Sequence, residues 1–455
     1  MVRGVEEALR TAGSQLSSDR SGRRYTALQS MRTSRAALVL LAVLAATSAR
    51  ASEDEELLRE AERMARLQGG GAASREELQA LVTEMLPRVG KVMRLPVPAR
   101  IDLKVVSRDE ARAALLEVLR RDYPGDLLER LSESLAAVGL VAPGTDLRTE
   151  AQSLYGGNVS GFYDPHQRRL YLLADQPLAA QALVVAHELA HAVQDEAVRL
   201  DAASRKVRAS EDAQLALSAA IEGQAQQVAS LVLAGEGGGS GDEGIDLGSF
   251  LTEAAAASAA MAAGQASVPW LGLQMSFPYA SGAGLVAAVR TPDDPAATSI
   301  LRRLPRSTAQ VLDPALYRAD ERPKEARLDL ASRIPGSAAV YATTLGAANL
   351  NLFGDLHGGG ELGRGWRGDR LETARQGTQL FAVWAVGYAS PDGAERLVKA
   401  WSGALGGGTD KPATQPDGSR YVLRRSGNVA VLLENVPADR VGELVTAAAS
   451  AFRER

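Results

Sequence analysis

The 455-residue sequence contains no cysteine and only four histidines, and aromatic residues make up only 4% of it. Without cysteine the chain forms no disulfide bonds and cannot build a zinc site from thiolates. Lysine and arginine number 51 and aspartate and glutamate 55, so the net charge of −4 is small. The absence of a basic bias argues against nucleic-acid binding. The length allows two or three domains.

Two of the four histidines fall in one apolar, helix-favouring stretch, residues 185–195, which reads VAHELAHAVQD. His187 and His191 are four residues apart, so a helix places them on one face, one turn apart. Two neutral imidazoles so placed can share one zinc ion. Glu188 then projects beside the metal, where it can take a proton from a water molecule that the metal holds. The alternative is a helix whose histidines cap its end or line a core.

A catalytic zinc site has three protein ligands and one open position. Because cysteine is absent, the third ligand must be histidine, aspartate or glutamate. Glu222 lies in the next helical segment, and a helix that folds back antiparallel would bring it to the metal. Gly223 costs a helix about 1 kcal/mol relative to alanine, so it indicates a close approach of these two helices. Alternatively, Glu222 is an ordinary solvated residue. We expect one Zn²⁺ per chain, held by His187, His191 and Glu222, with Glu188 as the general base.

This pattern resembles the gluzincin metallopeptidases, the broad thermolysin-like group. More closely, the chain is similar to a set of secreted bacterial gluzincin-like proteins over roughly residues 100–455. The further matching stretches are residues 161–165 (GFYDP), 170–172, 277–279 with Gly282, 306–314 and 365–370. The resemblance implies an α+β fold: a zincin-like metallopeptidase domain with a helical active-site hairpin, plus a smaller C-terminal α+β domain. It also implies a peptide or protein substrate.

Three positions depart from these relatives. Gln224 stands where they usually carry aspartate after Glu-Gly, and Gln226 where thermolysin-like enzymes place an aspartate that orients a zinc histidine. Asp313 stands where relatives often have histidine before proline. These departures motivate a rival hypothesis, a catalytically degenerate secreted binding or scaffold protein that keeps the fold. A third hypothesis is an enzyme that acts on a different bond, such as an amide in a cell-wall component.

Other residues are candidates for supporting roles. Asp195, one turn past His191, either accepts a hydrogen bond from a ligand imidazole or is solvated at the helix end. Tyr279 and Tyr317 are candidates for hydrogen bonding to the transition state, with packing as the alternative. In gluzincins an edge strand binds extended substrate backbone, and by resemblance residues 170–173 lie near the substrate cleft. The alternative for them is a purely structural hairpin.

The N-terminal part of the sequence predicts export. Residues 31–51 combine a basic start, a short apolar core and Ala49-Arg50-Ala51, which is typical of a signal peptide cleaved after Ala51. We expect residues 1–30 to be a non-native upstream extension, with the true start at Met31. An uncleaved N-terminal anchor is the alternative. The prediction is a periplasmic or extracellular protein with no stable membrane span after cleavage.

Local signals organise the remaining chain. Residues 52–99 predict an N-terminal helical segment, 100–332 the metallopeptidase domain and 333–455 the C-terminal domain. Ser74 with Glu77 and Ser107 with Glu110 predict capping boxes that open helices. Further expected elements are a strand at 101–106, a hairpin at 162–173, a glycine-rich linker at 235–244, a helix at 254–263, a strand and helix at 338–356, a loop at 365–370, a strand at 379–386, a helix at 391–405, a hairpin at 420–434 and a helix at 437–452.

Overall fold

The computed structural model describes residues 71–157, 160–234, 264, 266–406, 412–415 and 418–452. The predicted upstream extension, signal peptide, glycine-rich linker and helix at 254–263 lie outside these residues, as does the start of the predicted N-terminal helical segment. The chain divides into two compact units, residues 1–71 with 177–180 and residues 72–176 with 181–455. All elements below belong to the second unit, apart from the first residues of helix α8. The domain boundary at residue 333 stays a prediction.

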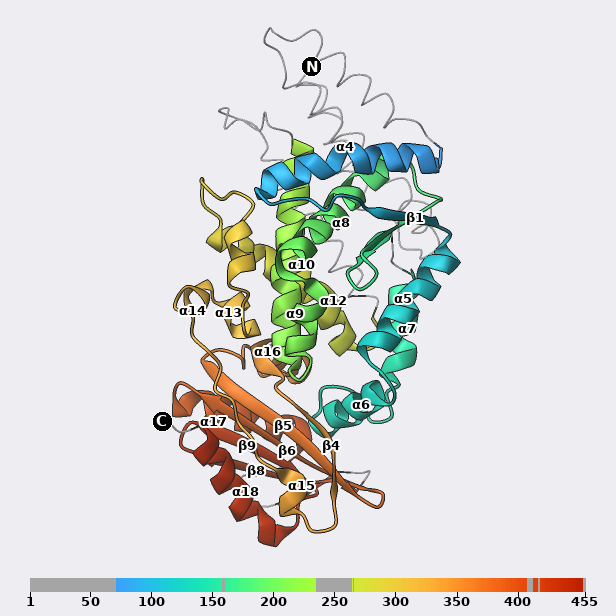
Figure 1. Cartoon of the computed structure of the whole chain (residues 1–455). Coiled ribbons are helices and arrows are strands. Elements are labelled where there is room, and N and C mark those ends of the chain that lie inside the picture. The colour runs from blue at the N-terminus through green and yellow to red at the C-terminus, as the bar shows by residue number, and fades with distance from the viewer. Residues whose placement is uncertain are drawn as a thin grey trace, which may run out of the picture. The chain divides into compact units, whose positions relative to one another are not determined.

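The described residues form a mixed α+β structure, which confirms the expected class (Figure 1). Both predicted capping boxes are present: Ser74 pairs with Glu77, and Ser107 pairs with Glu110. None of the described helices combines the length and apolar character that a membrane span needs. The helices of the N-terminal half are α4 (Arg75–Met93), α5 (Arg108–Asp122), α6 (Leu127–Ala137), α7 (Leu147–Gly157), α8 (Leu178–Val198), α9 (Leu200–Val207) and α10 (Glu211–Ala234).

A three-stranded sheet precedes α8 along the chain. It consists of β1 (Asp102–Val106), β2 (Gly161–Asp164) and β3 (Arg169–Leu173) in the order β1-β3-β2. β3 is parallel to β1 and antiparallel to β2, so it is paired along both edges. Residues 170–173 are therefore not an edge strand that could bind substrate backbone, and their expected place near the substrate cleft stays a prediction. Among the described strands of this sheet, β2 has an unpaired edge beside the candidate site.

A close helix pair follows. The helices after α10 are α12 (Pro269–Val289), the 3₁₀ helix η1 (Thr298–Arg302), α13 (Thr308–Leu312), α14 (Pro314–Arg318) and α15 (Leu330–Arg333). A Cβ atom on Gly223 of α10 would lie 2.3 Å from the carbonyl carbon of Gly282 in α12. One on Gly282 would lie 2.1 Å from the carbonyl oxygen of Ala219. The close approach predicted from Gly223 is thus made with α12 and not with the histidine-bearing helix.

The C-terminal part is a six-stranded antiparallel sheet covered on both faces. Its strand order is β4-β5-β6-β9-β8-β7. The strands are β4 (Ala338–Thr343), β5 (Trp366–Gln376), β6 (Gln379–Tyr388), β7 (Ala413–Thr414), β8 (Arg420–Ser426) and β9 (Val429–Glu434), and the helices are α16 (Gly346–His357), α17 (Pro391–Leu405) and α18 (Ala438–Ala451).

Alternation along the strands builds two cores. In β6, Trp384 belongs to the core that contains residues of α16 and α17, whereas Val383 belongs to the core that contains residues of α15 and α18. The first core also includes Leu131 and Leu135 of α6, so helices of the N-terminal half share it. Of residues 365–370, expected as a loop, residues 366–370 instead begin strand β5, and Asp369 within them is fully buried.

Candidate metal centre

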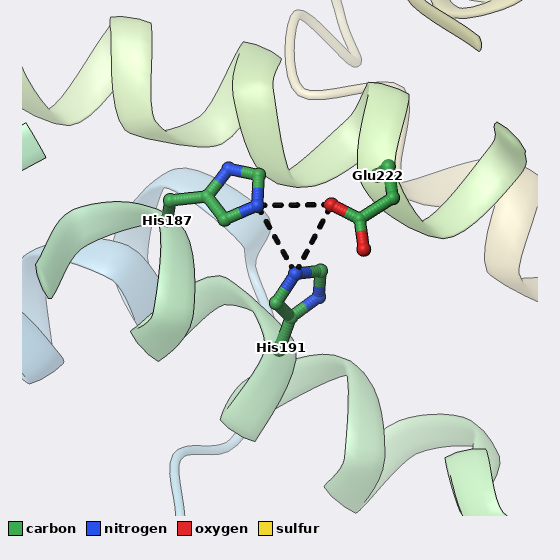
Figure 2. A group of neighbouring side chains, drawn as sticks. All are labelled: His187, His191 and Glu222. Carbon is green, nitrogen blue, oxygen red and sulfur yellow. Dashed lines mark hydrogen bonds and ion pairs between the residues drawn. The ribbon is translucent and has the colours of Figure 1, made fainter. Parts of the chain in front are cut away.

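Helix α8 holds the two motif histidines inside the molecule. The apolar residues around them are almost completely buried, Val185, Ala186, Leu189 and Ala190 each having 0% exposure. The periodicity of α8 turns both imidazoles toward α10, which supplies Glu222 (Figure 2). Helix α10, which follows α8 after the short helix α9, therefore brings Glu222 to the two histidines, as the sequence predicts.

The three candidate ligand atoms form a nearly regular triangle. Oε2 of Glu222 lies 3.0 Å from Nε2 of His187 and 3.4 Å from Nε2 of His191, and the two Nε2 atoms are 3.1 Å apart (Figure 2). Two ligands at 2.0–2.1 Å from a tetrahedral zinc ion are separated by roughly 3.3 Å. The triangle therefore has the dimensions of one face of a zinc coordination tetrahedron. No other comparable group of histidine, aspartate and glutamate occurs among the described residues.

The three candidate ligands are partly exposed to solvent. The side chains of His187 and Glu222 are 15% and 23% exposed, whereas that of His191 is 10% exposed. A structural zinc site is closed by a fourth protein ligand, and a catalytic one leaves a position for water or substrate. Three candidate ligands with partly exposed side chains match a catalytic zinc site.

Charge couples the three side chains even without a metal. Burial alone would lower the pKa of His191, but the facing carboxylate of Glu222 raises it to about 9. Burial alone would raise the pKa of Glu222, but His191 and His187 hold it well below its usual range. The carboxylate is therefore ionised and directed at the histidines, which is the protonation state that a metal ligand needs.

The imidazole of His191 is oriented by Gln194. Nδ1 of His191 lies 2.8 Å from Oε1 of Gln194, and Nε2 of Gln194 donates to the carbonyl oxygen of Ile221 and to Oε1 of Gln224, each at 2.9 Å. Gln194 and Gln224 are fully buried. With Nδ1 donating to the amide, Nε2 is the nitrogen that faces the other ligands. Sequence reasoning missed this partner, although its position three residues after His191 was a usable signal.

Asp195 does not fill the role expected of it. Its carboxylate accepts hydrogen bonds from the Tyr163 hydroxyl at 3.1 Å and from the backbone N–H of Leu200 at 2.8 Å. It also lies 3.6 Å from Nε of Arg168. No described contact joins it to either histidine.

The candidate base Glu188 is buried beside the three candidate ligands. Its Oε2 accepts a hydrogen bond of 2.8 Å from the backbone N–H of Tyr163 in β2. Sequence reasoning predicted the position of Glu188 next to the metal but not this partner. Strand β2 and helix α8 are thus joined at the residue that would carry the proton.

Of the two tyrosine candidates, the structure brings only one to the site. The ring of Tyr279 in α12 lies 6.2 Å from the ring of His187, nearly parallel to it. Tyr317 instead donates its hydroxyl hydrogen bond to the carbonyl oxygen of Arg303 and packs under that guanidinium. Asp313 is exposed and caps helix α14 through the N–H of Ala315.

Gln224 and Gln226, the two departures that lie in α10, are both buried but differ in their hydrogen bonds. Gln224 takes part in the amide network, although its Nε2 has no partner among the described residues. Gln226 is 4% exposed, and neither polar atom of its amide has a described hydrogen-bond partner. The departures noted in the sequence therefore leave the three candidate ligands intact but place neutral amides near them.

Residues 125–245 match the model of the family described as "Putative metallopeptidase family (DUF6782)". The matched stretch includes β2, β3, α8 and Glu222, and so contains the whole candidate centre. No curated protein and no solved structure matches the chain. The family match covers less than half of the sequence, and its description is consistent with a metallopeptidase.

Proposed function

We propose that this protein is an exported zinc metallopeptidase of the gluzincin type, with a zincin-like domain around α8 and α10. The observation that carries this proposal is the triangle of Nε2 of His187, Nε2 of His191 and Oε2 of Glu222, with Glu188 beside it. The family match supports hydrolysis of peptide bonds by a metalloenzyme. When bound, zinc would lower the pKa of water and polarise the scissile carbonyl.

Glu188 is the group that moves the proton. Its Oε2 is bonded to the Tyr163 N–H, which leaves Oε1 to take a proton from the attacking water. The same carboxyl then passes that proton to the leaving amine. The aliphatic residues of α8 around the two histidines are fully buried, so they form a rigid apolar support for the ligands.

The substrate class follows from β2 and α12. β2 is at one edge of its sheet, where the Tyr163 N–H is taken by Glu188, so an extended peptide would add as a further strand through the backbone groups of β2 that Glu188 does not engage. The ring of Tyr279 lies 6.2 Å from that of His187, and we assign to its hydroxyl the hydrogen bond to the carbonyl oxygen on which negative charge develops. A peptide or protein substrate fits both features.

Two variants test the proposal. Purified full-length protein, prepared without chelator, should contain close to one zinc per chain by mass spectrometry. Glu222→Ala should lose most of the zinc. Glu188→Gln should keep the zinc but lose hydrolysis of internally quenched peptide libraries by at least about a hundredfold. A folded wild type that takes up no zinc, or a Glu188→Gln protein with undiminished cleavage, would reject it.

One observation favours the rival binding or scaffold function. Asp313, which stands where relatives often carry histidine, is used to cap α14, so that histidine has no counterpart in the described site. A protein that holds zinc stoichiometrically but cleaves no peptide in broad libraries would favour this rival.

Export is part of the proposal and has its own test. Residues 31–51 have the organisation of a signal peptide, with cleavage expected after Ala51. N-terminal sequencing of the protein recovered from the periplasm or medium of an expressing bacterium should begin at Ser52. Recovery only inside the cell with an intact N-terminus would contradict export.

A further inference from the structure

The side chains of the GFYD stretch of β2 have no role in the proposal so far, which uses only the backbone of this strand. We propose that Tyr163 and Asp195 are positioning residues: they seat β2 on helix α8, so that the Tyr163 N–H fixes the carboxylate of Glu188 for proton transfer. This inference rests on the proposed role of Glu188. It assigns to Asp195 a function toward the base instead of toward a metal ligand.

Tyr163 contacts α8 at two places. Its backbone N–H donates to Oε2 of Glu188 at 2.8 Å, and its hydroxyl donates to Oδ2 of Asp195 at 3.1 Å. Glu188 and Asp195 are two turns apart, about 10 Å along the helix axis. Because the backbone of residue 163 is bonded to Glu188, its side chain must be long and end in a donor to reach Asp195. Tyr163 is only 9% exposed, so this bridge is buried.

Asp195 is itself held in place from three sides. Oδ1 accepts from the N–H of Leu200 at 2.8 Å, which ties the carboxylate to the start of α9. Arg168 lies 3.6 Å from Oδ2 and also pairs with Glu196. Arg168 is in the turn between β2 and β3 and has a positive φ of 53°. The turn therefore accepts an unfavourable backbone conformation while its side chain binds α8.

Gly161 allows the strand to come this close. A Cβ atom there would lie 2.8 Å from Cγ1 of Val184 in α8 and 3.0 Å from the carbonyl oxygen of Tyr171. At the other end of β2, Asp164 is 2% exposed and accepts two hydrogen bonds from the guanidinium of Arg121. Gly161 and Tyr163 thus fix β2 relative to α8, and Asp164 fixes it relative to α5.

The chemical consequence concerns the orientation of Glu188. A glutamate side chain has three rotatable bonds, and proton transfer needs its free oxygen within hydrogen-bond reach of the water. The Tyr163 N–H engages one oxygen and so fixes the plane of the carboxylate. If the Tyr163–Asp195 bridge is lost, β2 is released at that point and the carboxylate samples other rotamers. The free oxygen is then correctly placed for a smaller fraction of the time.

Tyr163→Phe tests this role, and Tyr171→Phe is its matched control. Tyr171 is also buried, lies in the neighbouring strand β3, and directs its hydroxyl to Gln167 at 3.4 Å and not to α8. Zinc-loaded full-length proteins would be compared by hydrogen–deuterium exchange at the amide of residue 163 and by kcat and KM on internally quenched peptides. Asp195→Ala is the second variant, because it removes the other half of the bridge.

We expect Tyr163→Phe and Asp195→Ala to speed exchange at residue 163 by roughly tenfold or more. Their kcat should fall by about tenfold, with KM changed less than twofold and zinc content unchanged. Tyr171→Phe should match the wild type in both measurements. Unchanged exchange at residue 163, or faster exchange with unchanged kcat, would overturn the positioning role. A wild type that cleaves no peptide would instead reject the proposed function, and the exchange result alone would then decide whether Tyr163 holds Glu188.

Discussion

At the scale of single residues, the candidate metal centre is supported by a neutral amide. Metal-binding histidines usually donate their second ring N–H to a carboxylate, a backbone carbonyl or water. Here His191 donates to Gln194, whose own N–H groups continue to Ile221 and Gln224 of the facing helix. The same side chain therefore fixes the imidazole and joins α8 to α10. A neutral partner adds no negative charge to the site.

Replacing Gln194 should weaken metal binding without removing a ligand. Gln194→Leu leaves Nδ1 of His191 buried without a partner, so we expect zinc affinity to fall by roughly ten- to a hundredfold. A chelator-competition titration measures it. Gln181→Leu is the control, because Gln181 is also a fully buried glutamine of α8 but bonds to the carbonyl oxygen of Leu173. Equal affinities in the two variants would argue against the orienting role.

The ligands were predictable because their spacing is local. A helix fixes the relation of His187 to His191, and Glu222 needed only the assumption of an antiparallel return. The partner of His191 was not predictable in the same way. Asp195 and Gln194 are both within one turn of His191, and the choice depends on rotamers set by α10. The hydrogen bond from Tyr163 to Glu188 depends on how β2 packs against α8, and the hydrophobic periodicity of the sequence does not predict that packing.

At the scale of elements, one glycine contact sets the distance between α10 and α12. Gly223 directly follows the candidate ligand Glu222, and Gly282 is one turn after Tyr279. The two glycines let the helix backbones meet with no side chain between them. The helix that carries a ligand and the helix that carries Tyr279 are therefore in direct backbone contact beside the site.

Gly282→Ala should destabilise the fold because the new Cβ would meet the backbone of Ala219, which cannot rotate away. We expect a loss of about 2 kcal/mol or more in the free energy of unfolding, measured in urea. Gly284→Ala is the matched control in the same helix, because its Cβ would have nothing within 4 Å.

The control should be neutral or up to about 1 kcal/mol more stable, because alanine is the better helix former. Two variants of equal stability would contradict the close contact as a determinant of packing.

Elements with a clear local signature were predicted, and elements defined by tertiary contacts were not. Capping boxes and the hairpin before α8 are confirmed. Gly223 indicated a close approach but could not identify the partner helix, because a small residue reports only that something is near. The first residues of strand β5 were predicted as a loop, because Asp369 and the arginines beside it interrupt the alternation of apolar and polar residues that is typical of a strand. The structure satisfies that carboxylate internally, with N–H groups from Leu345 and Gly346.

At the scale of the whole unit formed by residues 72–176 and 181–455, helix α10 connects the candidate centre to the C-terminal sheet. Its first residues, Glu211 and Asp212, are buried. Glu211 accepts a hydrogen bond of 2.7 Å from the Tyr341 hydroxyl in β4. Asp212 accepts from the backbone N–H of Thr308 at 2.8 Å and from its hydroxyl at 2.5 Å. The ligand-bearing helix therefore begins among buried carboxyl groups.

This junction should make stability depend on pH. Burial raises the pKa of Asp212 to about 7, and the neighbouring Asp369 adds to the effect. The folded pKa lies above the unfolded value of about 3.9, so the folded state binds the proton more tightly. The stabilisation is fully present below about pH 4 and is lost as the pH rises through about 7.

Asp212→Asn should remove that part of the pH dependence. Between about pH 5 and pH 8 the wild type should lose up to about 3 kcal/mol more unfolding free energy than the variant. Urea unfolding at both pH values measures the difference. Burial also raises the pKa of Glu211 and Asp369, but both remain in the variant, so the comparison isolates Asp212. Parallel pH dependences would show that Asp212 is not the group responsible.

The four tryptophans of the sequence all belong to the same core, the one that contains residues of α16 and α17. Trp366 and Trp384 both donate their indole N–H to the single carboxylate of Asp369 at 3.0 Å. Intrinsic fluorescence of this protein is therefore a built-in reporter of that one core. A change in emission on heating or on changing pH will report a change in the hydrogen bonds between these two indoles and the Asp369 carboxylate. Metal uptake between His187 and Glu222 needs a probe of its own.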